Sequence, residues 1–155
     1  MPLWELAKAT GVVASSAVAF APSKASNTVY HLHPAVESVC IEFNPQTQVA
    51  DVVPALQIEL KRHRIESRVY ESGTPLDRCP VWLMYSAFVE WDTPPMGEGF
   101  KAYMSNARLT LRTTEGAVLS SSNYELDSTF FRGRWASTRS KLEPVVTALV
   151  TGFEN

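Results

Sequence analysis

The sequence predicts an α/β (α+β) protein, a two-layer sandwich in which two helices cover one face of a five-stranded mixed sheet. Two observations lead to this fold class. Five segments show the alternation or the continuous apolar run of β-strands, and two segments repeat apolar residues at the spacing of an amphipathic helix. Their order is β-α-β-β-β-β-α. Because each helix must cover one apolar face, both are expected on the same side of the sheet.

The first three elements predict a parallel pair of strands joined by a helix. Residues 37–43 alternate between apolar and polar side chains and are followed by Asn-Pro, which ends a strand. Residues 49–64 have helical spacing, with Asp51 as the expected N-cap and Pro54 in the first turn, where its missing N–H does no harm. Residues 65–72 form the second strand.

The remaining strands predict an antiparallel meander. Residues 79–91 are the most apolar segment, which is typical of a strand covered on both faces. Residues 106–113 alternate cleanly, turn at Gly116 and return as residues 118–126. The final helix carries an apolar stripe over residues 142–153.

The chain divides into an N-terminal segment (residues 1–26), a linker (residues 27–36) and a single α/β domain (residues 37–155). The linker is polar, contains proline and has no sustained periodicity. Its His31-Leu32-His33 places two imidazoles near each other, but no third ligand lies near in sequence, so a solvent-facing linker is favoured over a metal site.

The N-terminal segment has two interpretations. Its apolar run, residues 11–21, is too short to span a bilayer and resembles the core of a secretory signal, with Ala-x-Ala at residues 17–19. Glu5, however, offsets the charge of Lys8 in a region that should be basic. A helix docked on the domain is the alternative. Any membrane association is expected through this segment.

Composition excludes some classes of function. With 155 residues, 45% hydrophobic residues and 19% charged residues, the chain is the size of one globular domain. Its net charge of −2 argues against nucleic acid as the main partner, because such proteins neutralise phosphates with a positive excess. Cys40 and Cys79 fit no zinc pattern; composition slightly favours two buried thiols over a single disulfide.

No catalytic motif is present in the sequence, so an enzyme is not expected, and neither a cofactor nor a metal is predicted. There is no GxSxG, HExxH, phosphate loop or GxGxxG. Glu90 and Asp92 flank Trp91 at a strand end and resemble the paired acids of a glycosidase. Acids beside a proline-rich loop are more often merely solvated, so a small hydrolase ranks last.

The candidate binding surface combines two loops rich in aromatic residues and arginine. If the loops meet at one end of the sheet, they form a patch suited to a sugar, a peptide or a partner protein. Ordinary core and rim packing is the alternative. The candidate residues are Trp91, Met96, Phe100, Phe130, Phe131, Arg132, Arg134 and Trp135.

The start of the final helix is ambiguous in the sequence. Ser140 and Glu143 have the spacing of a capping box, and Ser137 and Thr138 offer further hydroxyls. With Ser140 as the cap, Pro144 falls where it removes a helical hydrogen bond. The cap is therefore expected either at Ser140 or earlier.

Three stretches, VCIEFNP, CPVWLMYSAFVEWD and RWASTRSKLEPVVTALV, are similar to a set of small proteobacterial envelope lipoproteins, some of which are labelled cell-division proteins. Their C-terminal pattern, K/R-W-x-S-T-x-x-K-x-x-P, matches Arg134, Trp135, Ser137, Thr138, Lys141 and Pro144. The resemblance covers roughly residues 37–153. It implies an envelope location and a Cys40–Cys79 disulfide, but no established activity. In contrast to those lipoproteins, neither cysteine lies near the N-terminus.

Three hypotheses follow for function. The first is a non-enzymatic module of the periplasm or cell envelope that binds a partner protein or a cell-wall component through the two loops. The second is a structural subunit of a larger secretion or envelope assembly, docked through residues 1–26. The third is the hydrolase. A cytoplasmic location is the alternative to the envelope, and the oligomeric state is left open.

Overall fold

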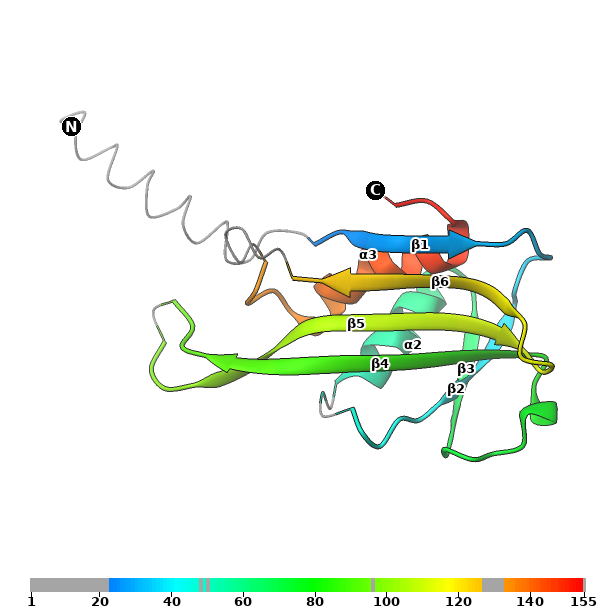
Figure 1. The fold of residues 1–155 in the computed structure, drawn as a ribbon, viewed down its shortest axis with the longest axis horizontal. Coiled ribbons are helices and arrows are strands. Elements are labelled where there is room, and N and C mark those ends of the chain that lie inside the picture. Colours follow the sequence, from blue (N-terminus) through cyan, green and yellow to red (C-terminus); the bar gives the residue numbers. More distant parts are fainter. Residues whose placement is uncertain (1–22, 48, 50, 96, 127–132, 155) are drawn as a thin grey trace.

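The computed structural model describes residues 23–47, 49, 51–95, 97–126 and 133–154. Within these ranges the chain forms one sheet of six strands with two α-helices (Figure 1). The elements are β1 (Ala25–Tyr30), β2 (Ser38–Glu42), α2 (Val52–Arg62), β3 (Glu66–Tyr70), the short 3-10 helix η1 (Leu76–Arg78), β4 (Val81–Asp92), β5 (Lys101–Thr113), β6 (Val118–Glu125) and α3 (Thr138–Thr151).

The strands lie in the order β1-β6-β5-β4-β2-β3. β2 is parallel to both β3 and β4, whereas β4, β5 and β6 form an antiparallel meander. The predicted parallel pair and meander are therefore both confirmed. The hairpin turn between β5 and β6 also forms as expected, with Gly116 at a φ of 91° that favours glycine.

The predicted number of strands was wrong, because the sheet has six strands rather than five. The additional strand, β1, begins at Ala25 and runs through residues that the sequence assigned to the N-terminal segment and the linker. It pairs antiparallel with β6, and its register shifts between Ser26 and Val29, with Asn27 at a φ of 51°. Its few apolar residues show no clear alternation because of this bulge, so pairing with β6, and not local pattern, makes it a strand.

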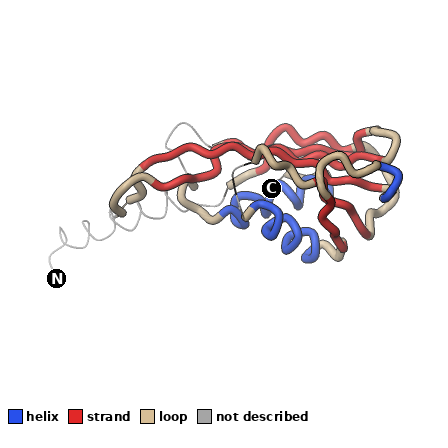
Figure 2. Tube along the Cα trace, turned by 90° about the horizontal axis from the view of Figure 1, so that it is seen from below, coloured by secondary structure: helices blue, strands red, loops and turns tan. Residues whose placement is uncertain are grey.

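Both helices cover the same face of the sheet, as predicted (Figure 2). The main core lies between them and the sheet, with Leu83, Leu109 and Leu149 fully buried in it. α2 begins after Asp51, and Pro54 falls in its first turn, as expected. The Asp51 side chain caps no backbone N–H, however, and instead accepts a hydrogen bond from the Thr138 hydroxyl at 3.0 Å.

A second, smaller cluster contains Cys40, Cys79 and Trp82. Alternation along β2 explains its position, since Val39 and Ile41 lie in the main core and Cys40 points away from it. Cys40 and Cys79 form a disulfide, with their Cα atoms 6.2 Å apart. The disulfide implied by the resemblance is therefore present, and it ties β2 to the segment that leads into β4.

The end of the chain folds back over β1. Gly152 ends α3 with a φ of 82°, and a Cβ atom there would lie 2.8 Å from Cγ of Tyr30. Two residues later, Glu154 accepts a hydrogen bond from the Thr28 backbone N–H at 2.8 Å. Hydrogen bonding to Thr28, from its side chain first and its backbone second, lowers the pKa of the Glu154 carboxyl group. The C-terminal residues thus satisfy a donor on the edge strand.

Candidate functional site

The two predicted loops meet at one end of the sheet. Arg134, from the segment before α3, forms an ion pair with Asp92 at the end of β4. The Arg134 side chain is largely buried, with 12% of its surface exposed. Trp135 is half-buried beside it. The binding surface expected from the sequence required the two loops to meet, and this ion pair brings them together.

The candidate residues differ in how they are placed. Trp91 and Phe100 are exposed, by 64% and 74%, near the tip of the β4–β5 hairpin. Arg134 and Trp135 pack inward instead and serve partly as structural residues. Met96, Phe130, Phe131 and Arg132 lie outside the described residues.

Tyr103, on β5, organises the junction between the loops. Its ring meets the ring of Trp135 edge-on, with the centroids 5.2 Å apart, and the Arg134 guanidinium lies 5.1 Å from its centroid. Its hydroxyl donates a hydrogen bond to Glu90 at 3.1 Å. Burial and then this hydrogen bond raise the pKa of Tyr103.

Lys141 is the unexpected residue of the site, because its side chain is buried in the first turns of α3. Its ammonium group donates to the backbone carbonyls of Met104, at 2.9 Å, and Arg134, at 2.5 Å. It also lies within 6 Å of the ring centroids of Tyr103 and Tyr124. Burial, together with the nearby positive charge of Arg134, lowers the pKa of Lys141 to about 8.

Tyr124, whose ring lies near the Lys141 ammonium group, is also buried. Its side chain is 1% exposed, and within the part of the chain that the structure describes its hydroxyl has no hydrogen-bond partner. Burial therefore raises the pKa of Tyr124 well above its ordinary value. Burial therefore favours the neutral phenol of Tyr124 and disfavours the charged ammonium of Lys141.

A cavity of about 340 Å³ opens beside these groups. Its lining combines the apolar or aromatic side chains of Val89, Tyr103 and Trp135 with the polar groups of Asp51, Ser137 and Lys141. A recess of this kind offers apolar contact area together with a few polar groups that can orient a bound molecule.

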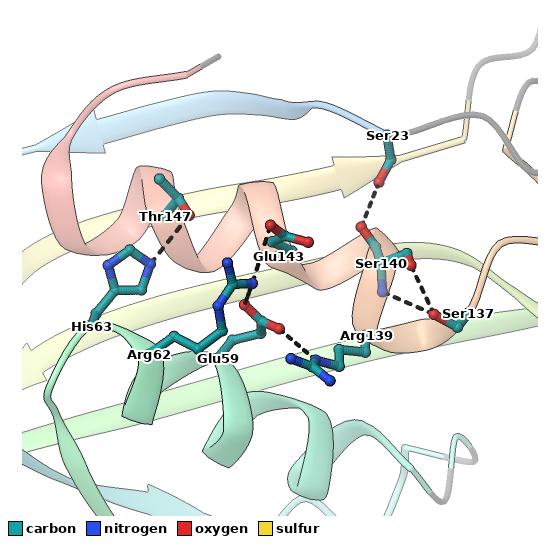
Figure 3. Close-up of polar contacts among 9 residues, drawn as sticks. All are labelled: Ser23, Glu59, Arg62, His63, Ser137, Arg139, Ser140, Glu143 and Thr147. Carbon is teal, nitrogen blue, oxygen red and sulfur yellow. Dashed lines mark hydrogen bonds and ion pairs between the residues drawn. The ribbon is translucent and has the colours of Figure 1, made fainter.

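The start of α3 resolves the ambiguity left by the sequence. Ser137 is the N-cap, and its hydroxyl accepts the Ser140 backbone N–H at 3.1 Å (Figure 3). The capping box at Ser140 was therefore the wrong alternative, and the earlier cap is correct. Pro144 still removes the helical donor to the Ser140 carbonyl, which instead accepts from the Ser23 hydroxyl at 3.2 Å.

An ionic cluster joins the two helices behind the site (Figure 3). Glu59 on α2 is fully buried and pairs with Arg139 on α3 at 2.8 Å and with Arg62 at 3.0 Å. Arg62 also reaches Glu143 at 3.1 Å, which raises the pKa of the Arg62 guanidinium. Nearby, the His63 ring contacts the Thr147 hydroxyl at 3.2 Å, so this histidine belongs to the contact between the helices.

The sequence reading missed Tyr103 and Lys141 as site residues. A signal existed for Lys141, because it precedes the buried Val145 by four residues and Ala148 by seven and so falls on the apolar stripe of α3. A lysine on such a stripe needs acceptors in the core. Tyr103 gave no comparable signal, since a tyrosine at the start of a strand is common.

No cluster of three His, Cys, Asp or Glu side chains suited to a metal ion occurs among the described residues. In the same part of the chain, none of the helices combines the length and apolar character needed to cross a bilayer.

Comparisons with known proteins relate the chain to others at the level of the fold. The sequence matches no protein-family model and no curated protein. The structure is similar to a single-substitution variant of the PelC dodecamer from Paraburkholderia phytofirmans, with a TM-score of 0.56 and 15% identity over 80% of this chain and 97% of that chain. A PelC dodecamer in another crystal form gives a TM-score of 0.47 at 15% identity, over 77% and 98% of the two chains. The first of these similarities establishes a shared fold.

Proposed function

We propose that this protein is a non-enzymatic accessory module of the cell envelope that binds a partner protein or a cell-wall component where the two loops meet. The observation that carries the proposal is the cavity of about 340 Å³ beside Tyr103 and Trp135, with Trp91 exposed near the tip of the adjoining hairpin. Tryptophan, tyrosine and arginine are the residues that most often dominate binding energies at interfaces.

An envelope location is supported by the disulfide. Cys40 and Cys79 are bonded to each other, and such bonds form and persist mainly in oxidising compartments such as the periplasm. The resemblance to envelope lipoproteins leads to the same location. Five of the six matched positions, all except Pro144, make structural contacts here, so the pattern would mark the shared fold rather than a reaction.

A binding role fits the chemistry of the cavity better than catalysis does. Its serine, Ser137, donates to the Ser140 hydroxyl and accepts the Ser140 N–H, so this oxygen serves the helix cap. Its amine, Lys141, is held by two carbonyls. Glu90 accepts from Tyr103 and Asp92 pairs with Arg134, so the two acids of the hydrolase hypothesis both have structural partners.

Site-specific photocrosslinking tests this proposal. A benzoylphenylalanine placed at Ala102, an exposed position lining the cavity, should give a discrete crosslinked protein in the native cell or retain the chain on purified peptidoglycan. The same group at Ile58, exposed on α2, is the matched control and should give neither. Equal behaviour at the two positions would count against a site at the cavity.

The second candidate is a structural subunit of a larger assembly, docked through residues 1–26. The shared fold with PelC, whose solved structures are dodecamers, favours it. Native mass spectrometry of the full chain decides this point. A closed ring of identical copies would support this second candidate, and a monomer at all accessible concentrations would argue against it. The crosslinking result tests the first proposal in either case.

A further inference from the structure

The ammonium group of Lys141 has one N–H for which the described residues supply no oxygen acceptor. A protonated lysine carries three N–H donors. Two of them reach the backbone carbonyls of Met104, at 2.9 Å, and Arg134, at 2.5 Å. The ring centroids of Tyr103 and Tyr124 lie 5.6 and 5.7 Å from the nitrogen, and a ring face is a weaker partner than a charged oxygen. The third N–H is therefore available to an acceptor that a ligand brings.

The charges around Lys141 favour an anion as that acceptor. Burial lowers the pKa of Lys141 most, the positive charge of Arg134 lowers it further, and the negative charge of Asp51 opposes them with a smaller effect. Lys141 takes part in none of the ion pairs among the described residues. A bound anion would give this ammonium a charge-assisted hydrogen bond and favour its charged form.

The position of Lys141 limits the size of the group that can reach it. Lys141 lines the cavity of about 340 Å³ together with Met104 and Arg134, the two residues whose carbonyls hold it. Lys141 is nevertheless only 1% exposed, so it lies at the base of the cavity and not at its rim. A small terminal group such as a carboxylate fits this position better than a bulky anion does.

The rest of the cavity lining suits the end of a peptide chain. Asp51 accepts one hydrogen bond, from the Thr138 hydroxyl at 3.0 Å, and an ionised carboxylate has about four acceptor sites, so Asp51 can also accept a peptide N–H. Val89 and Trp135 add apolar contact area. A simple inorganic anion would offer no donor to Asp51 and would be repelled by its charge. A peptide terminus carries a carboxylate, an N–H donor and an apolar side chain.

We propose that the cavity binds the free C-terminal carboxylate of a peptide, with the carboxylate on the Lys141 ammonium, an N–H on Asp51 and an apolar side chain against Trp135. Capture of a terminal carboxylate is a recurring mode of peptide recognition. This inference rests on the proposed function, because it names the group that the cavity recognises. Both ligand classes of that proposal supply such a group, since partner proteins and the stem peptides of peptidoglycan both end in carboxylates.

Peptides that differ only at the C-terminus test the inference with the full chain. The probes are acetyl-Ala-Ala-Leu, which represents a protein terminus, and diacetyl-Lys-D-Ala-D-Ala, which represents a stem peptide, each as the free acid and as the amide. Isothermal titration calorimetry should show that the acid of at least one peptide binds roughly tenfold or more tightly than its amide, because a neutral amide does not neutralise the buried ammonium. The peptide that binds more tightly identifies the source of the ligand.

A second readout is the pKa of Lys141 itself, followed by NMR of protein with labelled lysine. The value of about 8 in the free protein should rise when the acid peptide is bound and should stay unchanged with the amide at the same concentration. Arg134 remains charged in this range, and the raised pKa values of Tyr103 and Tyr124 keep both phenols neutral below about pH 9. The rise therefore reports the new anion.

Lys141→Met removes the proposed donor and keeps an apolar side chain of similar length. In this variant the acid and the amide should bind with equal affinity. Lys61→Met, at an exposed position on α2, is the matched control and should keep the preference for the acid. Circular dichroism checks that both variants fold. If Lys141→Met does not fold, the comparison of acid and amide and the pKa measurement in the wild type decide the question.

Either of two results would overturn the inference: equal binding of acid and amide for both peptides, or an undiminished preference for the acid in folded Lys141→Met. The crosslinking experiment distinguishes this failure from failure of the proposed function. A photocrosslink specific to Ala102 in the absence of any preference for the acid would keep the cavity as a site and reject the carboxylate as its ligand. Equal behaviour at Ala102 and Ile58 would reject both.

Discussion

The Ser23 hydroxyl lies 3.2 Å from the Ser140 carbonyl oxygen and donates a hydrogen bond to it across 117 residues of sequence. This carbonyl is the one that Pro144 leaves without its helical N–H donor. The hydrogen bond that α3 lacks is thus replaced by one from the residues that lead into β1. This bond joins the segment before β1 to α3.

The first prediction concerns this compensation. Ser23→Ala should lower the free energy of unfolding by about 0.5–1.5 kcal/mol, because an acceptor in α3 loses its donor. In a Pro144→Ala background, where the helix supplies its own N–H, Ser23→Ala should leave the free energy of unfolding nearly unchanged. Urea unfolding of the four proteins of this double-mutant cycle measures the difference. Equal costs in both backgrounds would show that the two residues are not coupled.

The second prediction concerns pH. Lys141 has a pKa of about 8 in the folded protein and 10.5 as its reference value. Between these values the unfolded chain binds a proton that the folded chain lacks, so the free energy of unfolding should rise as pH increases from about 8 toward 10. Lys141→Met should remove this rise. Above about pH 10 the raised pKa of Tyr124 acts in the opposite direction, so the comparison should stop there.

The outcome that would contradict this prediction is the same pH dependence in the wild type and in Lys141→Met. Lys61→Met is the matched control, because Lys61 is exposed on α2 and should keep the wild-type profile.

The third prediction concerns the disulfide. Intact mass before and after reduction should differ by about 2 Da in protein from its native cell, as expected for one bridge in an oxidising compartment. Because Cys40 and Cys79 are 39 residues apart, replacing both with serine should lower the free energy of unfolding by about 2–4 kcal/mol. Two free thiols in the native protein would argue for a cytoplasmic location.

The fourth prediction concerns the buried acid between the helices. Glu59→Gln should lower the free energy of unfolding by about 2 kcal/mol, since it weakens contacts with Arg62 and Arg139 and leaves a buried amide. Glu66→Gln, at an exposed position on β3, should change stability by less than about 0.5 kcal/mol. Similar effects of the two changes would show that the cluster contributes little.

The sequence predicted the elements whose hydrophobic pattern is local. β4 and β5 alternate over many residues, and α2 has both a regular stripe and a proline in a permitted position, so each could be recognised in isolation. β1 could not, since Ser26, Asn27 and Thr28 carry no alternation and the bulge breaks the period. Its pairing depends on β6, about a hundred residues later.

The site was predictable in part for a similar reason. Trp91 and Phe100 flank a stretch rich in proline and glycine, so their exposure could be expected from the sequence. From the sequence, the surface was also expected to form only if the two loops met. The pairing of Arg134 with Asp92 depends on tertiary geometry. Lys141 was hidden because a lysine near a helix N-terminus is usually solvated, and its carbonyl acceptors come from a strand and a loop elsewhere in the chain.

The closure of the chain's end over β1 has a consequence for biogenesis. β1 finds its partner only when β6 has been made, and the Thr28 N–H finds its acceptor only when Glu154, which follows α3, has been made. A ribosome must therefore synthesise the chain through β6 before the sheet can be completed. Until β6 exists, the segment that becomes β1 has no partner, so folding of this sheet is expected to follow its synthesis and not to accompany it.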